Sequence, residues 1–343
     1  MTGLEIPDEV VRMNLAANGT AGRAWLDSLP GVVEELIDRW SLTIGGLRRR
    51  AVGFVAPAER HGGERLVLKV SFIDEETRHE PDALRRWDGD GAVRLIDAEP
   101  TRGALLLERL EPGTPLADHP DRGEATGVAC SLLRHLWRPV QDGYPFTRVP
   151  DLASRLADEL PGRFDRQDRP FDAGLLRTVV DLCRDLASSS REAVLANRDF
   201  HLGNVLAAER EPWLVIDPKP LVGERAFDTG HLVRTLLPER LDLASVDAVV
   251  GRLATELELE PAHVRGWAPV RSVDDALWEL SIGGTDVAWD VRCTRQLAER
   301  LSTSLRRPGL RRPGLRRPGL GSRHPGSRRV RCSQDRSRRS CGR

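Results

Sequence analysis

Lysine is almost absent from this sequence. Of the 52 basic residues only two, Lys69 and Lys219, are lysines, and the rest are arginines. A chain that uses arginine for nearly every cation keeps lysine where a compact ammonium on a flexible stem does what a planar guanidinium cannot. Binding a nucleotide phosphate is one such task. The segments around Lys69 and Lys219 are therefore candidates for a phosphate site.

Long apolar runs and ordered cysteine patterns are also missing. No stretch approaches the roughly 20 apolar residues of a membrane-spanning helix, and the acidic start at residues 4–9 is not a signal peptide. These absences predict a cytoplasmic protein that does not bind membranes. The five cysteines form no C-x-x-C pair and have no histidines at zinc-binding spacing, so we expect reduced thiols.

The formal net charge of zero conceals two parts of opposite sign. Residues 305–343 contain 14 Arg and one Asp, which leaves 38 basic and 51 acidic residues in 1–304. The field of this acidic part favours cationic ligands and disfavours nucleic acid. Its length allows two domains with a sizeable core.

The tail at 305–343 begins with three copies of Leu-Arg-Arg-Pro-Gly and continues with Arg, Ser and Gly. Since it has few apolar residues and much like charge, we expect it to be disordered. One interpretation is an arm that binds nucleic acid nonspecifically. The other is a translated repeat without function, because composition alone carries no mechanism.

A polar loop that enters a strand lies between the two lysines, at 197–206. Asp199 and Asn204 are five residues apart, and Asp217 follows an apolar segment at 213–216. In the protein-kinase template an Asp orients the attacking hydroxyl, an Asn five residues later binds metal, and an Asp on the next hairpin binds the main metal ion. The pattern predicts Asp199 as catalytic and Asn204 and Asp217 as metal ligands. The alternative is a hairpin in which these residues only form turns.

At this point the chain resembles the streptomycin 6-phosphotransferase and hydroxyurea phosphotransferase family, a branch of the aminoglycoside phosphotransferases. The resemblance is strongest over Asn197–Asp228 and extends over about Trp40–Trp289. Further matching segments lie at 68–72, 79–84, 91–95, 105–110 and 278–280. Where aminoglycoside phosphotransferases commonly have His-Gly before the catalytic Asp, this chain has Asn197-Arg198. That variant is typical of the streptomycin-like branch.

The resemblance implies an α+β, protein-kinase-like fold of two lobes: a small N-terminal β-sheet lobe with one main helix and a larger, mainly helical C-terminal lobe. It implies transfer of the ATP γ-phosphoryl group, with Mg²⁺, to a hydroxyl of an aminoglycoside, first of all streptomycin. Hydroxyurea or another small metabolite is the alternative acceptor. A noncatalytic ATP-binding regulatory protein is an alternative of another class, which the complete set of polar residues argues against.

We expect a nucleotide-binding lobe at 1–111, a catalytic and acceptor-binding lobe at 112–304 and the tail at 305–343. In the first lobe, Lys69 should hold the nontransferred phosphates and pair with a glutamate, for which the His-Glu pattern favours Glu80 over Glu76. A hinge should follow Glu108, with backbone groups near Glu108 and Leu110 binding the adenine edge. Gly45-Gly46 could begin a loop over the nucleotide, although an ordinary turn is as good an interpretation.

Apolar spacing predicts the secondary structure of both lobes. In the first lobe it predicts a helix at 7–40, strands at 42–44, 52–55 and 66–72, a helix from Asp74 to Trp87, and strands at 93–97 and 104–108. In the second it predicts helices at 123–137, 149–160, 173–186, 228–237, 243–257, 261–282 and 287–301. Asp228 is expected to cap its helix and hold the metal loop. His201 is expected to be structural and bonded to backbone.

The acceptor site is the least determined part. Asp274, Asp275, Trp278 and Glu279 could bind guanidinium or ammonium groups, with help from the segment at 286–290. Alternatively, the tryptophans spaced by eleven at 267, 278 and 289 are core residues and the carboxylates face water. Lys219 either reaches the γ-phosphate or braces the metal loop. The expected partner is a small cationic molecule with a hydroxyl, and the protein is expected to be a monomer.

Overall fold

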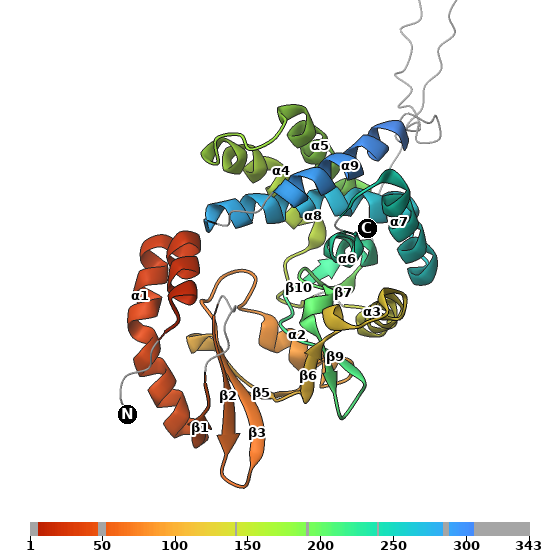
Figure 1. The fold of residues 1–343 in the computed structure, drawn as a ribbon. Helices are drawn as coiled ribbons and strands as arrows, with labels where there is room; N and C mark the ends of the chain where they lie inside the picture. Colours follow the sequence, from red (N-terminus) through yellow and green to blue (C-terminus); the bar gives the residue numbers. More distant parts are fainter. Residues whose placement is uncertain are drawn as a thin grey trace, which may run out of the picture. The chain divides into compact units, whose positions relative to one another are not determined.

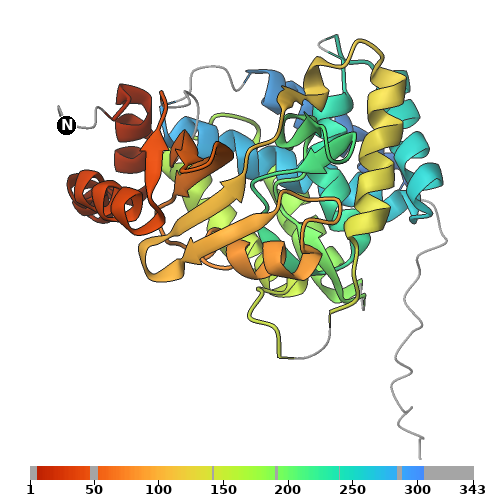
Figure 2. The same ribbon diagram turned by 90° about the horizontal axis from the view of Figure 1, so that it is seen from below.

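The computed structural model describes residues 6–46, 53–140, 143–189, 192–238, 240–283 and 288–304. Residues 1–304 form one compact unit, which is built of a sheet-containing lobe and a mainly helical lobe (Figures 1 and 2). The predicted tail at 305–343 and most of the predicted loop after Gly46 lie outside the described residues. No helix of the described part is long and apolar enough to cross a membrane.

The N-terminal lobe is a five-stranded antiparallel sheet with a helix on each face. Its elements are α1 (Asp8–Trp40), β1 (Leu42–Ile44), β2 (Phe54–Arg60), β3 (Glu64–Val70), α2 (Glu80–Trp87), β4 (Leu95–Glu99) and β5 (Ala104–Glu108). The strand order is β1-β2-β3-β5-β4. The central strand β3 carries Lys69, opposite Val55 on β2 and Leu105 on β5.

Alternation along β5 explains why both faces of the sheet are covered. Leu106 belongs to the core that α1 completes, whereas Leu105 and Leu107 belong to the core that α2 completes. Successive side chains of a strand point to opposite faces, so an apolar run is buried only between two layers. Figure 1 shows α1 on one side of the sheet and α2 on the other. The two helices of the lobe are those that the apolar spacing predicted, at 7–40 and before Trp87.

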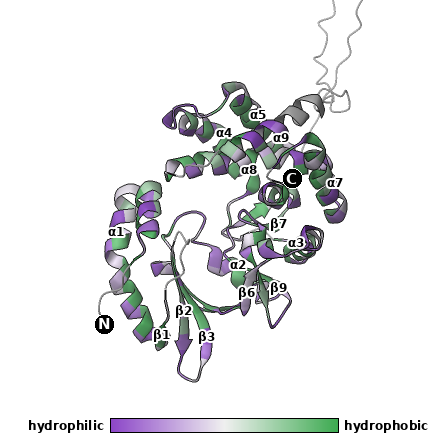
Figure 3. Cartoon of the chain, in the orientation of Figure 1, coloured by the Kyte–Doolittle hydropathy of each residue, from purple (hydrophilic) through white to green (hydrophobic). Residues whose placement is uncertain are grey.

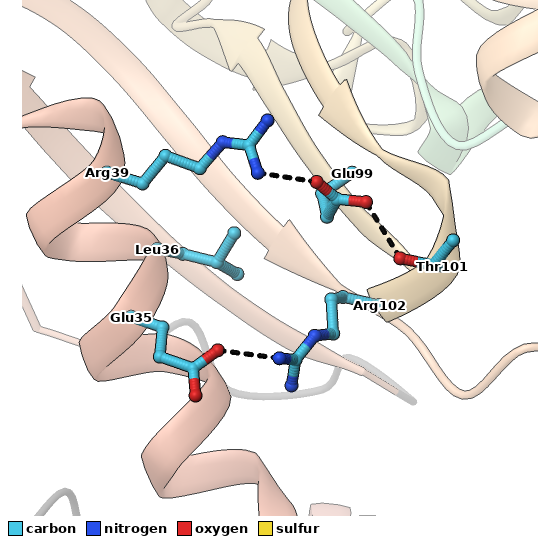
Figure 4. Close-up of a pocket in the computed structure, with 6 residues that line it drawn as sticks. All are labelled: Glu35, Leu36, Arg39, Glu99, Thr101 and Arg102. Atoms are coloured by element: carbon cyan, nitrogen blue, oxygen red, sulfur yellow. Dashed lines mark hydrogen bonds and ion pairs between the residues drawn. The ribbon is translucent and has the colours of Figure 1, made fainter.

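Two ion pairs connect α1 with the β4 end of the sheet. Arg39 binds Glu99 at 2.6 Å, and Glu35 binds Arg102 at 2.7 Å. They cross a cavity of about 200 Å³ that is also lined by Leu36 (Figure 4). Because these pairs are exposed, each stabilises the lobe by at most about 1 kcal/mol, and apolar packing under α1 holds the helix.

The predicted helix at Asp74 begins later than expected. The Asp74 carboxylate accepts hydrogen bonds from the backbone N–H groups of Glu76 and Thr77 and closes a turn. The helix α2 begins at Glu80. Pro81 explains the difference, because proline has no N–H and fits only the first turn of a helix.

Strand limits in this lobe also differ from those predicted. β2 runs from Phe54 to Arg60 instead of ending at 55, and β4 covers 95–99 instead of 93–97. β3 ends at Val70, two residues before the predicted limit. The hydrophilic turn between β2 and β3 (Figure 3) explains why the apolar pattern underestimated β2. β5 has the predicted limits.

The C-terminal lobe is mainly helical, with short strands around the predicted catalytic loop. Its helices and strands are β6 (Pro112–Pro115), α3 (Arg122–Leu136), α4 (Val149–Arg166), α5 (Ala173–Ser189), β7 (Val194–Asn197), β8 (Val205–Ala208), β9 (Trp213–Val215), β10 (Pro220–Gly223), α6 (Thr229–Leu236), α7 (Leu243–Leu257), α8 (Pro261–Ser281) and α9 (Ala288–Ser304). Short 3₁₀ helices lie at 100–102, 116–118, 202–204 and 225–228. All predicted helices of this lobe are present, and α4 extends beyond its predicted end at 160.

Two pairings place the catalytic loop between the lobes. β10 pairs with β7, and β8 lies between β6 and β9 in a three-stranded sheet. The chain before β4 also contacts β9: Val93 N–H donates to Val215 O at 2.8 Å, and Val215 N–H donates to Gly91 O at 3.1 Å. The end of β9, which leads to Asp217, is thereby held against the N-terminal lobe.

The contact between β10 and α4 gives a stability prediction. A Cβ atom on Gly223 would lie 2.4 Å from Val149 Cβ, which cannot move by side-chain rotation. We expect Gly223→Ala to lower the free energy of unfolding by about 1–3 kcal/mol through overpacking. Gly251→Ala on α7 is the matched control, because its Cβ would meet no atom within 4 Å and should stabilise the helix by about 0.5–1 kcal/mol. Urea unfolding measures both, and a Gly223→Ala variant as stable as the parent would contradict the packing.

Candidate active site

Lys69 is held by two carboxylates from different lobes. Its Nζ lies 2.6 Å from both oxygens of Glu80 on α2 and 2.6 Å from Oδ1 of Asp217 after β9. Burial alone would lower the pKa of Lys69, but Asp217 and Glu80 outweigh it and raise the pKa. The lysine is therefore charged, and it pairs with Glu80 as the sequence predicted.

Asp199 lies at the centre of a second polar cluster. Its Oδ2 is 3.1 Å from Lys219 Nζ and 3.3 Å from Asn204 Nδ2, and its Oδ1 is 3.3 Å from Nδ1 of His231 on α6. Burial would raise the pKa of Asp199, but Lys219 and His231 hold it well below its usual range. The carboxylate is therefore ionised and able to accept a hydrogen bond from a hydroxyl.

Buried and half-buried hydrogen bonds fix the loop that carries Asp199. The Asn197 side-chain oxygen accepts hydrogen bonds from the backbone N–H groups of Asp199 and Lys219, at 3.1 and 3.0 Å. Asn197 N–H in turn donates to Asp228 Oδ1 at 2.9 Å, and Trp137 Nε1–H donates to Asp228 Oδ2 at 2.8 Å. Asn197 thus joins the Asp199 loop to the Lys219 loop.

Asp228 does not cap α6 as expected. It precedes the helix, but its side chain accepts no capping hydrogen bond there. Both of its oxygens are already used by Asn197 and Trp137. The second part of the expectation, that Asp228 ties down the loop, agrees with these contacts.

His201 is bonded to backbone. Its Nδ1 accepts the Gly203 N–H at 3.0 Å, and its ring lies 4.8 Å from the ring of His231. Since Nδ1 is an acceptor, the proton of the neutral ring is on Nε2. Burial lowers the pKa of His201 to about 4.

Asn204 and Asp217 offer the kind of oxygen ligands that Mg²⁺ prefers, from neighbouring segments. Ile216 N–H donates to Asn204 O at 2.9 Å. Asn204 and Asp217, which follows Ile216, therefore lie at facing ends of the β8–β9 hairpin. Asn204 uses its amide nitrogen to bind Asp199, which leaves its side-chain oxygen for a metal. Asp217 uses Oδ1 for Lys69 and has a side chain that is 44% exposed. Carboxylate and amide oxygens are the ligands that this hard cation prefers.

At the hinge after β5, the two residues predicted near the adenine edge differ in their hydrogen bonds. Glu108 N–H donates to Arg94 O, and its carboxylate binds Arg94 N–H and the guanidinium of Arg210. Leu110 N–H has no hydrogen-bond partner in the part of the chain that the structure describes. A donor for a purine ring is therefore available at Leu110, whereas Glu108 supports the hinge.

The predicted acceptor residues do not form one surface. Asp274 is buried, and its carboxylate binds Arg163, Arg198 and Arg271 at 2.6–2.8 Å. Burial would raise its pKa, but these arginines lower it strongly. A carboxylate that three guanidinium groups already neutralise cannot bind a cationic ligand, so this part of the expected pocket does not fit the structure.

The other three candidates differ in exposure. Asp275 is half-buried with Oδ1 bound to Arg271 at 3.1 Å, Trp278 is 36% exposed, and Glu279 is partly exposed. The tryptophans do not share one environment either, since Trp267 is fully buried. The interpretation as a common core stripe is therefore wrong for Trp278. Residues 284–287 of the adjoining segment lie outside the described part.

The sequence analysis assigned no role in the site to Arg198 or His231, and it did not predict that Glu76 contacts Arg198 and Lys219. Arg198 joins the catalytic loop to Glu76 of the N-terminal lobe at 2.5 Å and to Asp274 of α8. Glu76 also lies 3.6 Å from Lys219. The only signal in the sequence was the Arg at 198 in place of glycine, because the partners are distant along the chain.

Comparison with solved structures shows which fold the chain has. The fold is similar to that of a thermostable mutant of aminoglycoside phosphotransferase APH(4)-Ia in a ternary complex with ADP and hygromycin B (TM-score 0.57, 16% identity, 78% of this chain and 97% of that chain). It is also similar to choline kinase LicA from Streptococcus pneumoniae (TM-score 0.58, 11% identity, 80% and 99%). The chain thus has the predicted two-lobed, protein-kinase-like fold.

Sequence comparison then gives the family. The model of the aminoglycoside/hydroxyurea antibiotic resistance kinases matches residues 39–283. Streptomycin 6-kinase from Streptomyces griseus is 37% identical over 293 residues, covering 83% of this chain and 94% of that protein. Hydroxyurea phosphotransferase from Kitasatospora aureofaciens is 37% identical over 292 residues, covering 82% of each. The chain belongs to the aminoglycoside/hydroxyurea antibiotic resistance kinase family and is a phosphotransferase.

The bond between His201 and Gly203 gives a pH prediction. The pKa of His201 in the folded state, about 4, lies below the value of about 6.5 in an unfolded chain. Between these values the unfolded state binds a proton that the folded state does not, so stability falls as pH falls through this window. We therefore expect His201 to lower the free energy of unfolding by about 2 kcal/mol at pH 5 relative to pH 7.5.

The His201→Asn variant isolates this effect, because the amide oxygen can accept the same N–H bond and does not titrate. Urea unfolding at pH 7.5 and pH 5 should show a smaller loss for the variant than for the parent. An equal loss in both proteins would show that His201 is protonated as easily in the folded state as in the unfolded one.

Proposed function

We propose that the protein transfers the γ-phosphoryl group of ATP to a hydroxyl of streptomycin and thereby confers resistance to the antibiotic. The observation that carries this proposal is the convergence of Lys69, Asp199, Asn204 and Asp217, from both lobes, in one polar site. This set supports catalysis over the alternative of a noncatalytic ATP-binding regulatory protein. Hydroxyurea is the second candidate acceptor, because a hydroxyurea phosphotransferase is as similar in sequence as the streptomycin kinases.

ATP would bind between the lobes. The adenine edge would meet the free N–H of Leu110, and the Lys69 ammonium would hold the nontransferred phosphates, oriented by Glu80. Asn204 and Asp217 would hold Mg²⁺, which neutralises charge on the phosphates when it is bound. Lys69 donates a hydrogen bond to Asp217. The group that would bind phosphate is therefore in direct contact with a group that would bind the metal.

Asp199 would orient the acceptor hydroxyl toward the γ-phosphorus and take its proton. Phosphoryl transfer depends mostly on positioning and on neutralising charge, so the fixed loop around Asp199 is the main contribution of the protein. Lys219, at 3.1 Å from Asp199, is close enough to serve the transferring phosphoryl group as well as the loop.

The acceptor would lie between Asp199 and α8. Asp275 has one buried oxygen with no hydrogen-bond partner among the described residues, and Trp278 is 36% exposed, so its indole would be available to stack on a cation. Glu279 follows on the same helix. The acidic composition of residues 1–304 favours a cationic molecule such as streptomycin. Hydroxyurea is uncharged and would gain nothing from this field.

We expect Asp199→Ala to lower the rate of streptomycin-dependent ADP formation by at least about 100-fold while Mg·ATP affinity stays within threefold. Asp217→Ala should lower the rate and also weaken Mg·ATP binding, because it removes a metal ligand. Asp181→Ala, at an exposed site on α5, is the control and should match the parent. Steady-state kinetics and isothermal titration with Mg·ATP measure the two effects.

Unchanged turnover in Asp199→Ala would contradict the assignment of this residue. The same assay with hydroxyurea in place of streptomycin decides between the two acceptors. If ADP forms with hydroxyurea and not with streptomycin, hydroxyurea is the acceptor.

A further inference from the structure

Two cationic side chains lie next to Asp199, on neighbouring segments of the chain. Arg198 follows β7, and Lys219 precedes β10, which pairs with β7. Arg198 N–H donates to Lys219 O at 2.9 Å, which fixes the two backbone segments side by side. Lys219 Nζ lies 3.1 Å from Asp199 Oδ2. The two cations therefore adjoin the residue that would orient the acceptor hydroxyl.

A single carboxylate from the N-terminal lobe bridges these cations. Oε1 of Glu76 lies 2.5 Å from Arg198 Nη1, and Oε2 lies 3.6 Å from Lys219 Nζ. A guanidinium and an ammonium that share the oxygens of one anion are the groups with which proteins bind phosphate. Arg198 and Lys219 thus form an anion site, and the anion that occupies it is a side chain of the protein itself.

A short turn before α2 carries Glu76 to this site. The Asp74 carboxylate accepts hydrogen bonds from the N–H groups of Glu76 and Thr77, at 2.8 and 2.9 Å. The neighbouring Glu75 binds Arg155 of α4 in the other lobe. Because these contacts hold the backbone of the turn, the Glu76 side chain can rotate into solvent without moving the turn.

Among the carboxylates of this network, Glu76 is the one most easily replaced. Its side chain is 34% exposed, compared with 17% for Asp199, which also binds Lys219, and 4% for Asp274, which also binds Arg198. Its distance of 3.6 Å from Lys219 is longer than a hydrogen bond. Leaving half-buried cations without a partner is unfavourable, so Glu76 should leave the site when another anion enters.

The position of the site selects the γ-phosphate of ATP as that anion. The nontransferred phosphates would lie at Lys69, which binds Asp217 at 2.6 Å. The γ-phosphate has to meet the acceptor hydroxyl at Asp199, and Lys219 is in contact with Asp199. ADP lacks this group, so its phosphates would stay at Lys69 and leave Glu76 in place.

We propose that Arg198 and Lys219 bind the γ-phosphate of ATP, and that the Glu76 carboxylate occupies their site until ATP displaces it. The inference rests on the proposed use of ATP. Glu76 then competes with ATP and not with ADP. Its return to the two cations after phosphoryl transfer would favour release of the phosphorylated product.

The test compares two nucleotides that differ in the γ-phosphate: ADP and AMP-PNP, an ATP analogue that is not turned over. Isothermal titration in the presence of Mg²⁺ measures both affinities. Glu76→Gln keeps the size of the side chain and removes its charge. We expect it to bind AMP-PNP about tenfold more tightly than the parent, with the affinity for ADP changed less than twofold. Glu75→Gln, in the same turn, is the matched control and should change neither affinity.

Substitution of the cations should have the opposite effect. Lys219→Gln and Arg198→Gln should each weaken AMP-PNP binding at least about tenfold and ADP binding less than threefold. Asp274 keeps Arg163 and Arg271 as partners in the second variant, and thermal unfolding confirms that each variant is folded.

Two results would overturn the proposal. One is AMP-PNP binding by folded Glu76→Gln that is no tighter than in the parent. The other is a loss of affinity in the two cation variants that is equal for ADP and AMP-PNP. If the parent and its variants show the expected affinities but the parent phosphorylates neither streptomycin nor hydroxyurea, the proposed function fails and the γ-phosphate site stands.

Discussion

The buried ammonium of Lys69 is the interaction on which the rest of this site depends. It lies on the central strand of the sheet and binds Glu80 from α2 and Asp217 from the opposite lobe, all at 2.6 Å. Breaking a buried ion pair by removing one partner costs about 3–5 kcal/mol, because a charge is left unpaired. The three side chains thus fix Asp217, the proposed metal ligand, relative to the strand that carries Lys69.

A second set of buried and half-buried contacts fixes the loop of Asp199 relative to the loop of Asp217 and Lys219. Asn197 binds the backbone on both sides of the site, at Asp199 and Lys219, and Asp228 binds Asn197. On the far side, Arg198 links the same loop to Glu76 and to Asp274 of α8. Groups held in advance at the positions that a transition state requires need no reorganisation during the reaction. This rigidity is the physical reason to expect catalysis rather than mere nucleotide binding.

Much of the site could be predicted because its signals are local. The rarity of lysine identified Lys69 and Lys219, and the spacing of Asp199, Asn204 and Asp217 follows from their positions on one loop and the next hairpin. The predicted start of α2 was wrong because Asp74 closes a turn and because Pro81 fits only the first helical turn. The predicted limits of β2 were wrong because Pro57 interrupts the apolar pattern and because the polar end, Glu59 and Arg60, pairs with β3 without being buried.

Contacts between distant segments were beyond prediction. Asp274 was predicted to bind the acceptor, but arginines from α4, the catalytic loop and α8 surround it. His231 reaches Asp199 only because α6 packs closely on α8 at Gly230. Neither arrangement leaves a periodic pattern in the sequence, since both depend on how the helices of the second lobe meet.

The most direct test of the central claim follows the phosphoryl group itself. The protein is incubated with ATP labelled with ³²P at the γ-position, Mg²⁺ and streptomycin, and the products are separated. The account predicts that the label appears in a streptomycin phosphate in amounts equal to the ADP formed. Label found only in inorganic phosphate, or no consumption of ATP with any hydroxyl acceptor, would contradict it.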